Sequence, residues 1–263
     1  TITGNLGSGK SSVAKILMER GYEYSSTGNI FRQLAMEKGL SVEEFNRQVN
    51  EAASRGDHSV DKMIDDTTTR IGEERDNVVF DSRLAWHFAP KSFKVFIITD
   101  IDEASRRVFN DSLRANSESY DSQDSCRKAL ISRQKLETVR YKEIYDIDYY
   151  DMSNYNLVIE STSAAPAEIA QEILDKMNAF QNGDFDKIME LNPSSVKVPS
   201  QDTVEKGTAD IEVIEKGGVF TLRAGKDRLD AAVAQGAKFV AVKVAGSEPG
   251  GEDSFMNFSN MSR

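Results

Sequence analysis

A glycine-rich run at the start of the sequence limits what this chain can fold into more than any other feature. Residues 4–11 read Gly-Asn-Leu-Gly-Ser-Gly-Lys-Ser, which satisfies the pattern G-x-x-x-x-G-K-[ST] at every defined position. Glycines let consecutive backbone N–H groups turn inward around an anion, and a helix that begins at the lysine directs its positive dipole end toward it. Such a loop needs a strand leading into it, so we expect that strand to begin upstream of Thr1.

The polar residues of this loop have distinct expected roles. Lys10 would place its charge between the β and γ phosphates of a nucleotide, and the Ser11 hydroxyl would ligate Mg²⁺. The predicted nucleotide-binding residues are Gly4, Gly7, Ser8, Gly9, Lys10, Ser11 and Ser12. The loop alone indicates a nucleoside triphosphate but no particular reaction, since motors, GTPases and ATPases use it too. The expected cofactors are ATP and Mg²⁺.

Apolar runs alternate with helical stretches over residues 1–180. Three runs read as buried strands, at residues 77–81, 93–98 and 156–159. Helical composition is found at residues 11–18, 28–37, 42–53, 103–114, 127–144 and 165–180. This alternation predicts an α/β domain, residues 1–180, with a parallel sheet covered by helices on both faces.

The pattern changes after residues 181–184. Residues 210–215 and 219–224 flank Gly217-Gly218 and predict a β-hairpin, followed by a helix at 226–234 and a strand at 238–244. We therefore expect a second, small α+β domain at residues 186–246. The stretch 247–263 is rich in Ser, Asn, Gly and Glu, which is typical of a loose tail.

Two segments after the loop supply candidates for binding an acceptor. Thr27 and Gly28 stand at a predicted helix start, with Arg32 one turn later, where it can reach a second phosphate. Asp81 and Arg83 end a buried strand, at the edge where parallel sheets bind ligands. Asp81 could hold Mg²⁺ through water and Arg83 could bind the acceptor phosphate. The alternatives are a plain capped helix and a solvated strand end.

A third set of candidates consists of arginines. Phosphoryl transfer needs charge neutralisation more than covalent chemistry, and Arg107, Arg133 and Arg140 could provide it from a mobile lid at residues 109–132. Arg133 and Arg140 are seven residues apart and so share one helix face. The alternative is an exposed helix with ordinary salt bridges.

Composition excludes several other classes. The net charge of −10 argues against nucleic-acid binding, and no apolar run is long enough to span a membrane. A lone Cys126 excludes an intramolecular disulfide, and His58 and His87 lack metal-ligand spacing. We expect a cytoplasmic protein that binds small molecules.

These pieces together resemble the cytidylate kinase family, particularly its short archaeal branch. The resemblance rests on residues 7–11, 26–32, 77–85, 140–148 and 155–159. It implies a three-layer αβα sandwich around a five-stranded parallel sheet, and transfer of phosphate from ATP to CMP or dCMP with Mg²⁺. It further implies that Thr27, Arg32 and Arg83 hold the acceptor phosphate. Arg107, Arg133 and Arg140 would be lid or transfer-site arginines.

The C-terminal domain resembles the ParB/sulfiredoxin-like fold. The likeness rests on residues 191–194, 220–229 and 239–242. It implies that Gly225 and Arg228 could bind a phosphate at a helix start. A degenerate scaffold or a dimerisation module is an equal alternative, so a homodimer stays open.

Three functions compete at this point. The leading hypothesis is an ATP-dependent nucleoside monophosphate kinase with a small nucleotide as its partner. A kinase for another small acceptor, and a non-catalytic ATP sensor that signals through the C-terminal domain, are the alternatives.

Overall fold

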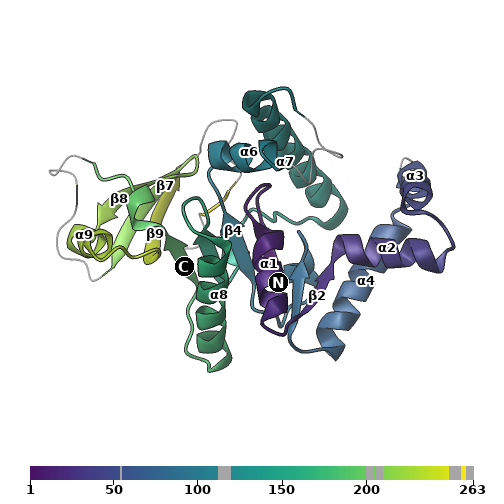
Figure 1. The fold of residues 1–263 in the computed structure, drawn as a ribbon, viewed down its shortest axis with the longest axis horizontal. Coiled ribbons are helices and arrows are strands. Elements are labelled where there is room, and N and C mark those ends of the chain that lie inside the picture. Colours follow the sequence, from purple (N-terminus) through teal and green to yellow (C-terminus); the bar gives the residue numbers. More distant parts are fainter. Residues whose placement is uncertain (54, 112–119, 200–203, 205–209, 249–255, 259–263) are drawn as a thin grey trace.

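The computed structural model describes residues 1–53, 55–111, 120–199, 204, 210–248 and 256–258. Within these residues the strands form one nine-stranded sheet in the order β2-β3-β1-β4-β5-β6-β9-β7-β8 (Figure 1). Helices cover this sheet, and an arm of helices extends from its β2 end. The C-terminal strands β9, β7 and β8 form its other end.

The first six strands of this order form the parallel part of the sheet. They are β1 (Ile2–Gly4), β2 (Glu23–Ser26), β3 (Val78–Asp81), β4 (Val95–Ile98), β5 (Leu157–Glu160) and β6 (Ile188–Leu191). Every neighbouring pair among them is parallel. The mixed α/β fold with a mostly parallel sheet is therefore confirmed. The carboxyl ends of these parallel strands lie at one edge of the sheet, which is where ligands bind in such folds.

Successive side chains of the central strands point to opposite faces of the sheet, and each face packs against its own layer of the protein. Val95 and Ile97 of β4 pack in one cluster with the buried faces of α1 (Lys10–Glu19) and α8 (Pro166–Gln181). Phe96 belongs to a second cluster with three tyrosines of the 147–155 segment and with Trp86 of α5 (Ala85–Phe88). Both faces are covered, which explains why β4 and β5 are buried at every position.

The arm consists of α2 (Thr27–Glu37), α3 (Val42–Ala53) and α4 (Ser59–Glu74). It has its own small core, which contains Ile30, Leu34, Phe45 and Ile64. The side chain of Ser26 caps α2 by accepting a hydrogen bond from a backbone N–H of its first turn. In Figure 1 this arm extends from the β2 side of the sheet, away from the C-terminal strands.

A helical hairpin stands over the carboxyl edge. It consists of α6 (Ile101–Phe109) and α7 (Gln123–Tyr145), which pack together around Ala104, Val108 and the fully buried Cys126. Ser122 and Ser125 form a reciprocal capping box at the start of α7. Leu6 of the glycine-rich loop joins the same cluster, so the hairpin is attached to that loop.

The C-terminal strands extend the same sheet. They are β7 (Ile211–Lys216), β8 (Val219–Ala224) and β9 (Val240–Glu248), with α9 (Lys226–Ala234) between the last two. β9 pairs antiparallel with β6 and parallel with β7. Val213 and Phe220 share a core cluster with Phe96 of β4. One sheet and one hydrophobic core include residues from both sides of the predicted boundary between residues 180 and 186. The division into two domains there therefore stays a prediction.

Several elements differ from the expectations. β2, α4, α5 and β6 were not predicted. The predicted helix at 103–114 is α6, which ends at Phe109, and residues 112–119 lie outside the described residues. The strand β9 continues to Glu248, beyond the predicted tail boundary. Further along that tail, Phe258 is fully buried and Asn257 pairs with Asp151, because an aromatic side chain reaches the shared core.

In the part of the chain that the structure describes, no helix combines the length and the apolar character needed to cross a bilayer.

Candidate active site

The glycine-rich loop connects β1 to α1 at the carboxyl edge of the sheet. A Cβ atom at Gly4 would lie 2.3 Å from a backbone oxygen of β4, and one at Gly7 would lie 2.7 Å from a backbone oxygen of α6. Only glycine fits such contacts. The buried Ser8 hydroxyl has no hydrogen-bond partner among the described residues. Since buried polar atoms are normally paired, this orphan inside a cradle at a helix start suits a polar ligand such as a phosphate.

Lys10 and Ser11, at the start of α1, form polar contacts of the glycine-rich loop. The Lys10 ammonium donates to the first two carbonyl oxygens of the loop, at 3.0 and 3.2 Å. The Ser11 hydroxyl donates to Oδ2 of Asp81 over 2.9 Å, and the Tyr24 hydroxyl donates to the same oxygen over 3.1 Å. The structure therefore brings the predicted metal pair, Ser11 and Asp81, into direct contact.

One cavity of about 520 Å³ lies on the α6 side of the loop. Its polar lining residues include Ser8, Ser12, Glu103, Arg106, Arg107, Thr162 and Ser163. We call it the donor cavity, because its floor is the glycine-rich loop and the first turn of α1.

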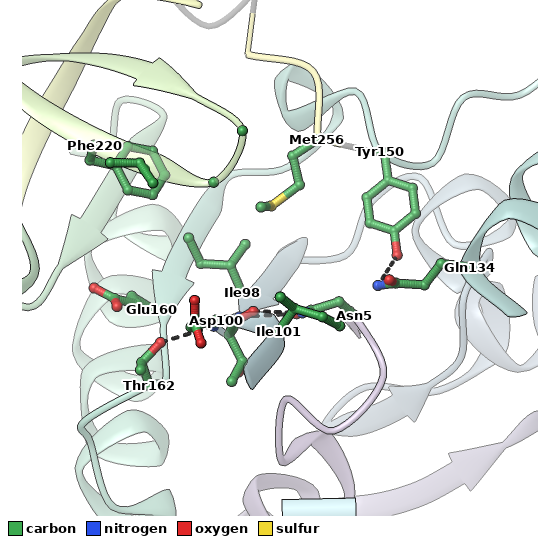
Figure 2. Close-up of a pocket in the computed structure, with 14 residues that line it drawn as sticks. Asn5, Ile98, Asp100, Ile101, Gln134, Tyr150, Glu160, Thr162, Phe220 and Met256 are labelled. Atoms are coloured by element: carbon green, nitrogen blue, oxygen red, sulfur yellow. Dashed lines mark hydrogen bonds between the residues drawn. The ribbon is translucent and has the colours of Figure 1, made fainter. Parts of the chain in front are cut away.

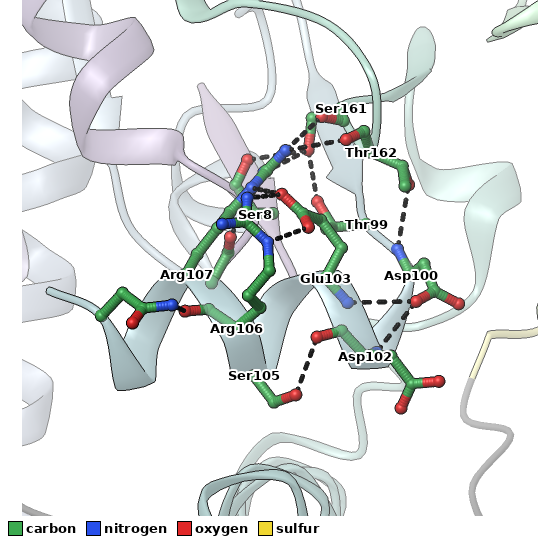
Figure 3. Close-up of polar contacts among 12 residues, drawn as sticks. Ser8, Thr99, Asp100, Asp102, Glu103, Ser105, Arg106, Arg107, Ser161 and Thr162 are labelled. Atoms are coloured by element: carbon green, nitrogen blue, oxygen red, sulfur yellow. Dashed lines mark hydrogen bonds and ion pairs between the residues drawn. The ribbon is translucent and has the colours of Figure 1, made fainter. Parts of the chain in front are cut away.

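Arg107 is held between this cavity and the end of β5. Its Nη2 atom donates to the carbonyl oxygens of Ser161 and Thr162, at 2.6 and 3.1 Å (Figure 3). Its Nε atom donates to Glu103 over 2.8 Å. Hydrogen bonds from Arg106 and Arg107 lower the pKa of Glu103 to about 2, against the opposing effect of burial. The structure places Arg107 beside the loop, and its role as a lid or transfer-site arginine stays a prediction.

A second cavity of about 310 Å³ lies on the other side of the Ser11–Asp81 pair. We call it the acceptor cavity. Its charged and polar lining includes Thr27, Asp61, Asp65, Thr68, Asp81, Ser82, Arg83, Arg133, Glu137, Arg140, Tyr141 and Tyr145. Four predicted site residues other than Asp81 therefore meet here: Thr27, Arg83, Arg133 and Arg140. They come from α2, the end of β3 and α7.

Glu137 joins two of these arginines. Its Oε2 atom accepts from Nε of Arg83 over 3.0 Å, and its Oε1 atom accepts from Nε of Arg133 over 3.1 Å. Burial alone would raise the pKa of Glu137, but the two guanidinium groups lower it below its ordinary value. Burial opposes the charge of Arg83, yet Glu137 raises the pKa of this arginine. Arg83 also donates to the carbonyl oxygen of Gly4, so it touches the loop.

The far end of the acceptor cavity is acidic and aromatic. Arg140 donates to both oxygens of Asp61, at 3.1 and 3.0 Å. The Tyr145 hydroxyl donates to Asp65 over 2.7 Å. Burial, opposed by the Tyr145 hydrogen bond and assisted by Asp61, raises the pKa of Asp65 to about 6. Arg140 therefore bonds a carboxylate of α4 in this structure, and a phosphate contact for it stays a prediction.

The start of α2 carries two residues predicted to hold the acceptor phosphate, Thr27 and Arg32. The Thr27 hydroxyl donates to the Ser82 hydroxyl over 2.9 Å, which ties the arm to the end of β3. Arg32 is exposed and donates to Asn29, next to Gly28, outside the residues that line the acceptor cavity. The predicted phosphate role of Arg32 would thus need its side chain to change direction.

Two features of the site were not predicted. The spacing of Arg133, Glu137 and Arg140 places all three on one face of a helix, so Glu137 could have been found by that signal. Asp61 and Asp65 lie on α4, which was not predicted as a helix, so no signal indicated them. The central part of the predicted lid, including residues 116–119, lies outside the described residues.

Known proteins resemble the part of the chain that holds the glycine-rich loop, the acceptor cavity and most of the donor cavity. Residues 1–163 match the sequence profile of the cytidylate kinase-like family. A cytidylate kinase from Methanococcoides burtonii is 35% identical over 163 residues, which is 62% of this chain and 86% of that kinase. One from Natronomonas pharaonis is 33% identical over 187 residues, covering 70% of this chain and 91% of that kinase.

A solved structure shows a related fold. It is that of an uncharacterised protein from Eubacterium ventriosum, with a TM-score of 0.50 and 15% identity, covering 68% of this chain and 96% of that one. At this identity the likeness concerns the fold alone. The profile match covers more than half of the chain and includes the loop, the Ser11–Asp81 pair and the predicted arginines Arg32, Arg83, Arg107, Arg133 and Arg140. The chain therefore belongs to the cytidylate kinase-like family.

Proposed function

We propose that this protein transfers the γ-phosphoryl group of ATP to a nucleoside monophosphate, and that the acceptor is CMP or dCMP. One observation carries the proposal: two cavities flank a single polar pair. Residues 9 and 12 of the loop line the donor cavity. Asp81, which is bonded to Ser11, lines the acceptor cavity. A phosphoryl group moving between two ligands bound in these cavities would pass over Ser11 and Asp81.

The side chains at this junction suit phosphoryl transfer. Lys10 and the N–H groups at the start of α1 would hold the donor phosphates, and Arg83 and Arg133 would neutralise charge on the acceptor side. The acceptor phosphate is already an anionic nucleophile, so no strong general base is needed. Orientation and charge neutralisation would account for most of the rate.

The donor atoms also fit Mg²⁺. The Ser11 hydroxyl and the Asp81 carboxylate offer oxygen ligands, which this hard cation prefers. No group of three or more His, Cys, Asp or Glu side chains among the described residues could hold a metal alone. Phosphate and water oxygens would complete the coordination, as is usual for Mg²⁺ with nucleotides. Bound Mg²⁺ would neutralise phosphate charge.

The acceptor identity is supported by the relatives, which are named cytidylate kinases and share 30–36% identity with this chain. ADP release from Mg-ATP should be measured with CMP, dCMP, UMP, AMP, GMP and free serine offered separately to the full chain. Strongest stimulation by CMP or dCMP is expected. Stimulation by another acceptor alone would overturn the cytidylate assignment, and ATP binding without any turnover would favour the sensor.

The remaining expectations about this chain stay proposals. They are the ParB/sulfiredoxin-like nature of residues 186–246, a cytoplasmic location and a homodimer. In the C-terminal part, Gly225 caps α9 with a left-handed backbone and Arg228 is exposed in the first turn of that helix. This geometry is compatible with phosphate binding there, and titration calorimetry with inorganic phosphate, comparing wild type with Arg228→Ala, tests it.

A further inference from the structure

The last residue of β5 connects the C-terminal part of the chain to the donor cavity. Glu160 is only 7% exposed, and its Oε2 atom accepts from the backbone N–H of Asn192 at 3.0 Å and from the Ser195 hydroxyl at 2.6 Å. The Ser195 hydroxyl also lies 2.9 Å from the carbonyl oxygen of Asn192. We assign the single hydroxyl hydrogen to the bond with Glu160, because this contact is the shorter of the two and its acceptor is a carboxylate.

These two hydrogen bonds stabilise the negative charge of the buried Glu160 carboxylate. Among the residues that the structure describes, no Lys, Arg or His side chain forms an ion pair with Glu160. A buried charge without a counter-charge depends on its hydrogen-bond donors, and losing one leaves the charge poorly solvated. Glu160 also lines a small cavity of about 120 Å³ between β5 and the β7–β8 turn, next to Phe220 (Figure 2). The hydrogen bonds from Asn192 and Ser195 therefore restrain the Glu160 side chain.

The next two residues, Ser161 and Thr162, form hydrogen bonds with the parts of the chain that line the donor cavity. The Ser161 hydroxyl donates to the carbonyl oxygen of Ser8 in the glycine-rich loop over 3.0 Å. The carbonyl oxygens of Ser161 and Thr162 accept from Arg107, and the Thr162 hydroxyl accepts from the N–H of Asp100 over 3.1 Å (Figure 3). We call residues 160–162 the strap. It fixes the loop, Arg107 and the start of α6 relative to one another.

The end of the strap and the chain that follows it form part of the wall of the donor cavity, because residues 162–166 line this cavity together with residues of the loop and of α6. A shift of the strap would therefore move this wall, the Ser8 carbonyl and Arg107 together. The acceptor cavity has no lining residue in the range 160–166. Such a shift should thus affect the donor nucleotide and spare the acceptor.

We propose that Glu160 is a positioning residue through which Ser195 and Asn192 hold the strap, so that donor-nucleotide affinity depends on the C-terminal part of the chain. The inference rests on the proposed function, because it takes ATP as the ligand of the donor cavity. In this role the C-terminal part of the chain supports ATP binding without catalysing a reaction itself.

The test compares Ser195→Ala with Ser194→Ala in the full chain. Ser194 is the exposed neighbour, and among the described residues its side chain forms no hydrogen bond with Glu160, which makes it a matched control. ATP affinity is measured by calorimetry without acceptor, and the KM values for ATP and CMP are measured separately. S195A should weaken ATP binding roughly three- to tenfold, as loss of a charge-assisted hydrogen bond predicts. KM for CMP should change less than twofold, and S194A should match wild type.

A double-mutant cycle with Glu160→Met, whose side chain of similar length has no oxygen to accept from Ser195, sharpens the test. If Ser195 acts through Glu160, adding S195A to E160M should weaken ATP binding by less than a further twofold. The inference is overturned if S195A equals S194A, if the two changes are additive, or if S195A raises both KM values alike with a matching fall in Tm. A wild-type protein that binds no ATP would instead contradict the proposed function itself.

Discussion

The Nε atom of Arg83 lies 3.0 Å from Oε2 of Glu137, and this ion pair joins the end of β3 to the middle of α7. Both side chains are less than a fifth exposed. Because Arg133 binds the other oxygen of Glu137, one carboxylate orients two of the arginines assigned to the acceptor. Glu137 thus holds both guanidinium groups at the acceptor cavity.

Glu137→Gln should therefore weaken the acceptor site more than the donor site. We expect KM for CMP to rise roughly tenfold, KM for ATP to stay within twofold, and stability to fall by about 1–3 kcal/mol, since a buried charge loses its partner. Steady-state kinetics and urea unfolding check this. Glu143→Gln, at an exposed position on the same helix, is the control. Equal effects of the two variants would refute the role of Glu137.

Lys10→Ala should abolish transfer and leave the fold intact. The ammonium is the charge closest to the predicted β and γ phosphates, so the rate should fall at least about a hundredfold. Circular dichroism and ADP release measure fold and turnover. Lys15→Ala, exposed on the same helix, should behave as wild type. Unfolding of K10A, or its unaltered turnover, would contradict the assignment.

The parts of the fold that were predicted are those with a strong local signal. The buried strands β4 and β5 read as continuous apolar runs because helices cover both of their faces. β2 is an edge strand whose residues are mostly polar, Glu23-Tyr24-Ser25-Ser26, so no such run marks it. In α4 only Ile64 and Thr68 are buried, which leaves too little apolar periodicity to indicate a helix.

The same distinction holds for the site. The glycine-rich loop is contiguous, so its role follows from local spacing. The Ser11–Asp81 contact joins residues 70 positions apart, and the Glu160–Ser195 contact joins residues 35 apart. Parallel topology predicts that Asp81 reaches the loop edge, but nothing in the sequence pairs Glu160 with Ser195. Contacts of this second kind depend on how β6 extends the sheet.

Asp81→Asn should weaken Mg²⁺ binding without unfolding the chain. The amide can still accept from Ser11 and Tyr24, but it lacks the negative charge that attracts the cation. We expect the Mg²⁺ concentration for half-maximal rate to rise about tenfold, measured at saturating nucleotide. Tyr24→Phe removes a hydrogen bond to the same oxygen and keeps the charge. A similar Mg²⁺ shift in Y24F would show that the hydrogen bond, rather than the charge, is what matters.

Asp65 should make stability depend on pH. Its folded pKa of about 6 lies above the ordinary value of 3.8, so the folded state binds this proton more tightly than the unfolded state. The contribution of Asp65 to stability is therefore most favourable below about pH 4 and is lost as pH rises through 6. Asp65→Asn removes the ionisation and keeps an oxygen to accept from Tyr145.

This substitution should stabilise the protein at pH 8 by about 1 kcal/mol, a figure reduced from the full shift because Asp65 is partly solvated. The gain should vanish at pH 4, where the wild-type carboxyl is protonated in the folded state. Urea unfolding of both proteins at the two pH values measures it. Asp66→Asn, at the exposed neighbouring position, should show no such pH-dependent gain. A gain for D65N that is equal at pH 4 and pH 8 would mean that its cause is not the charge of Asp65.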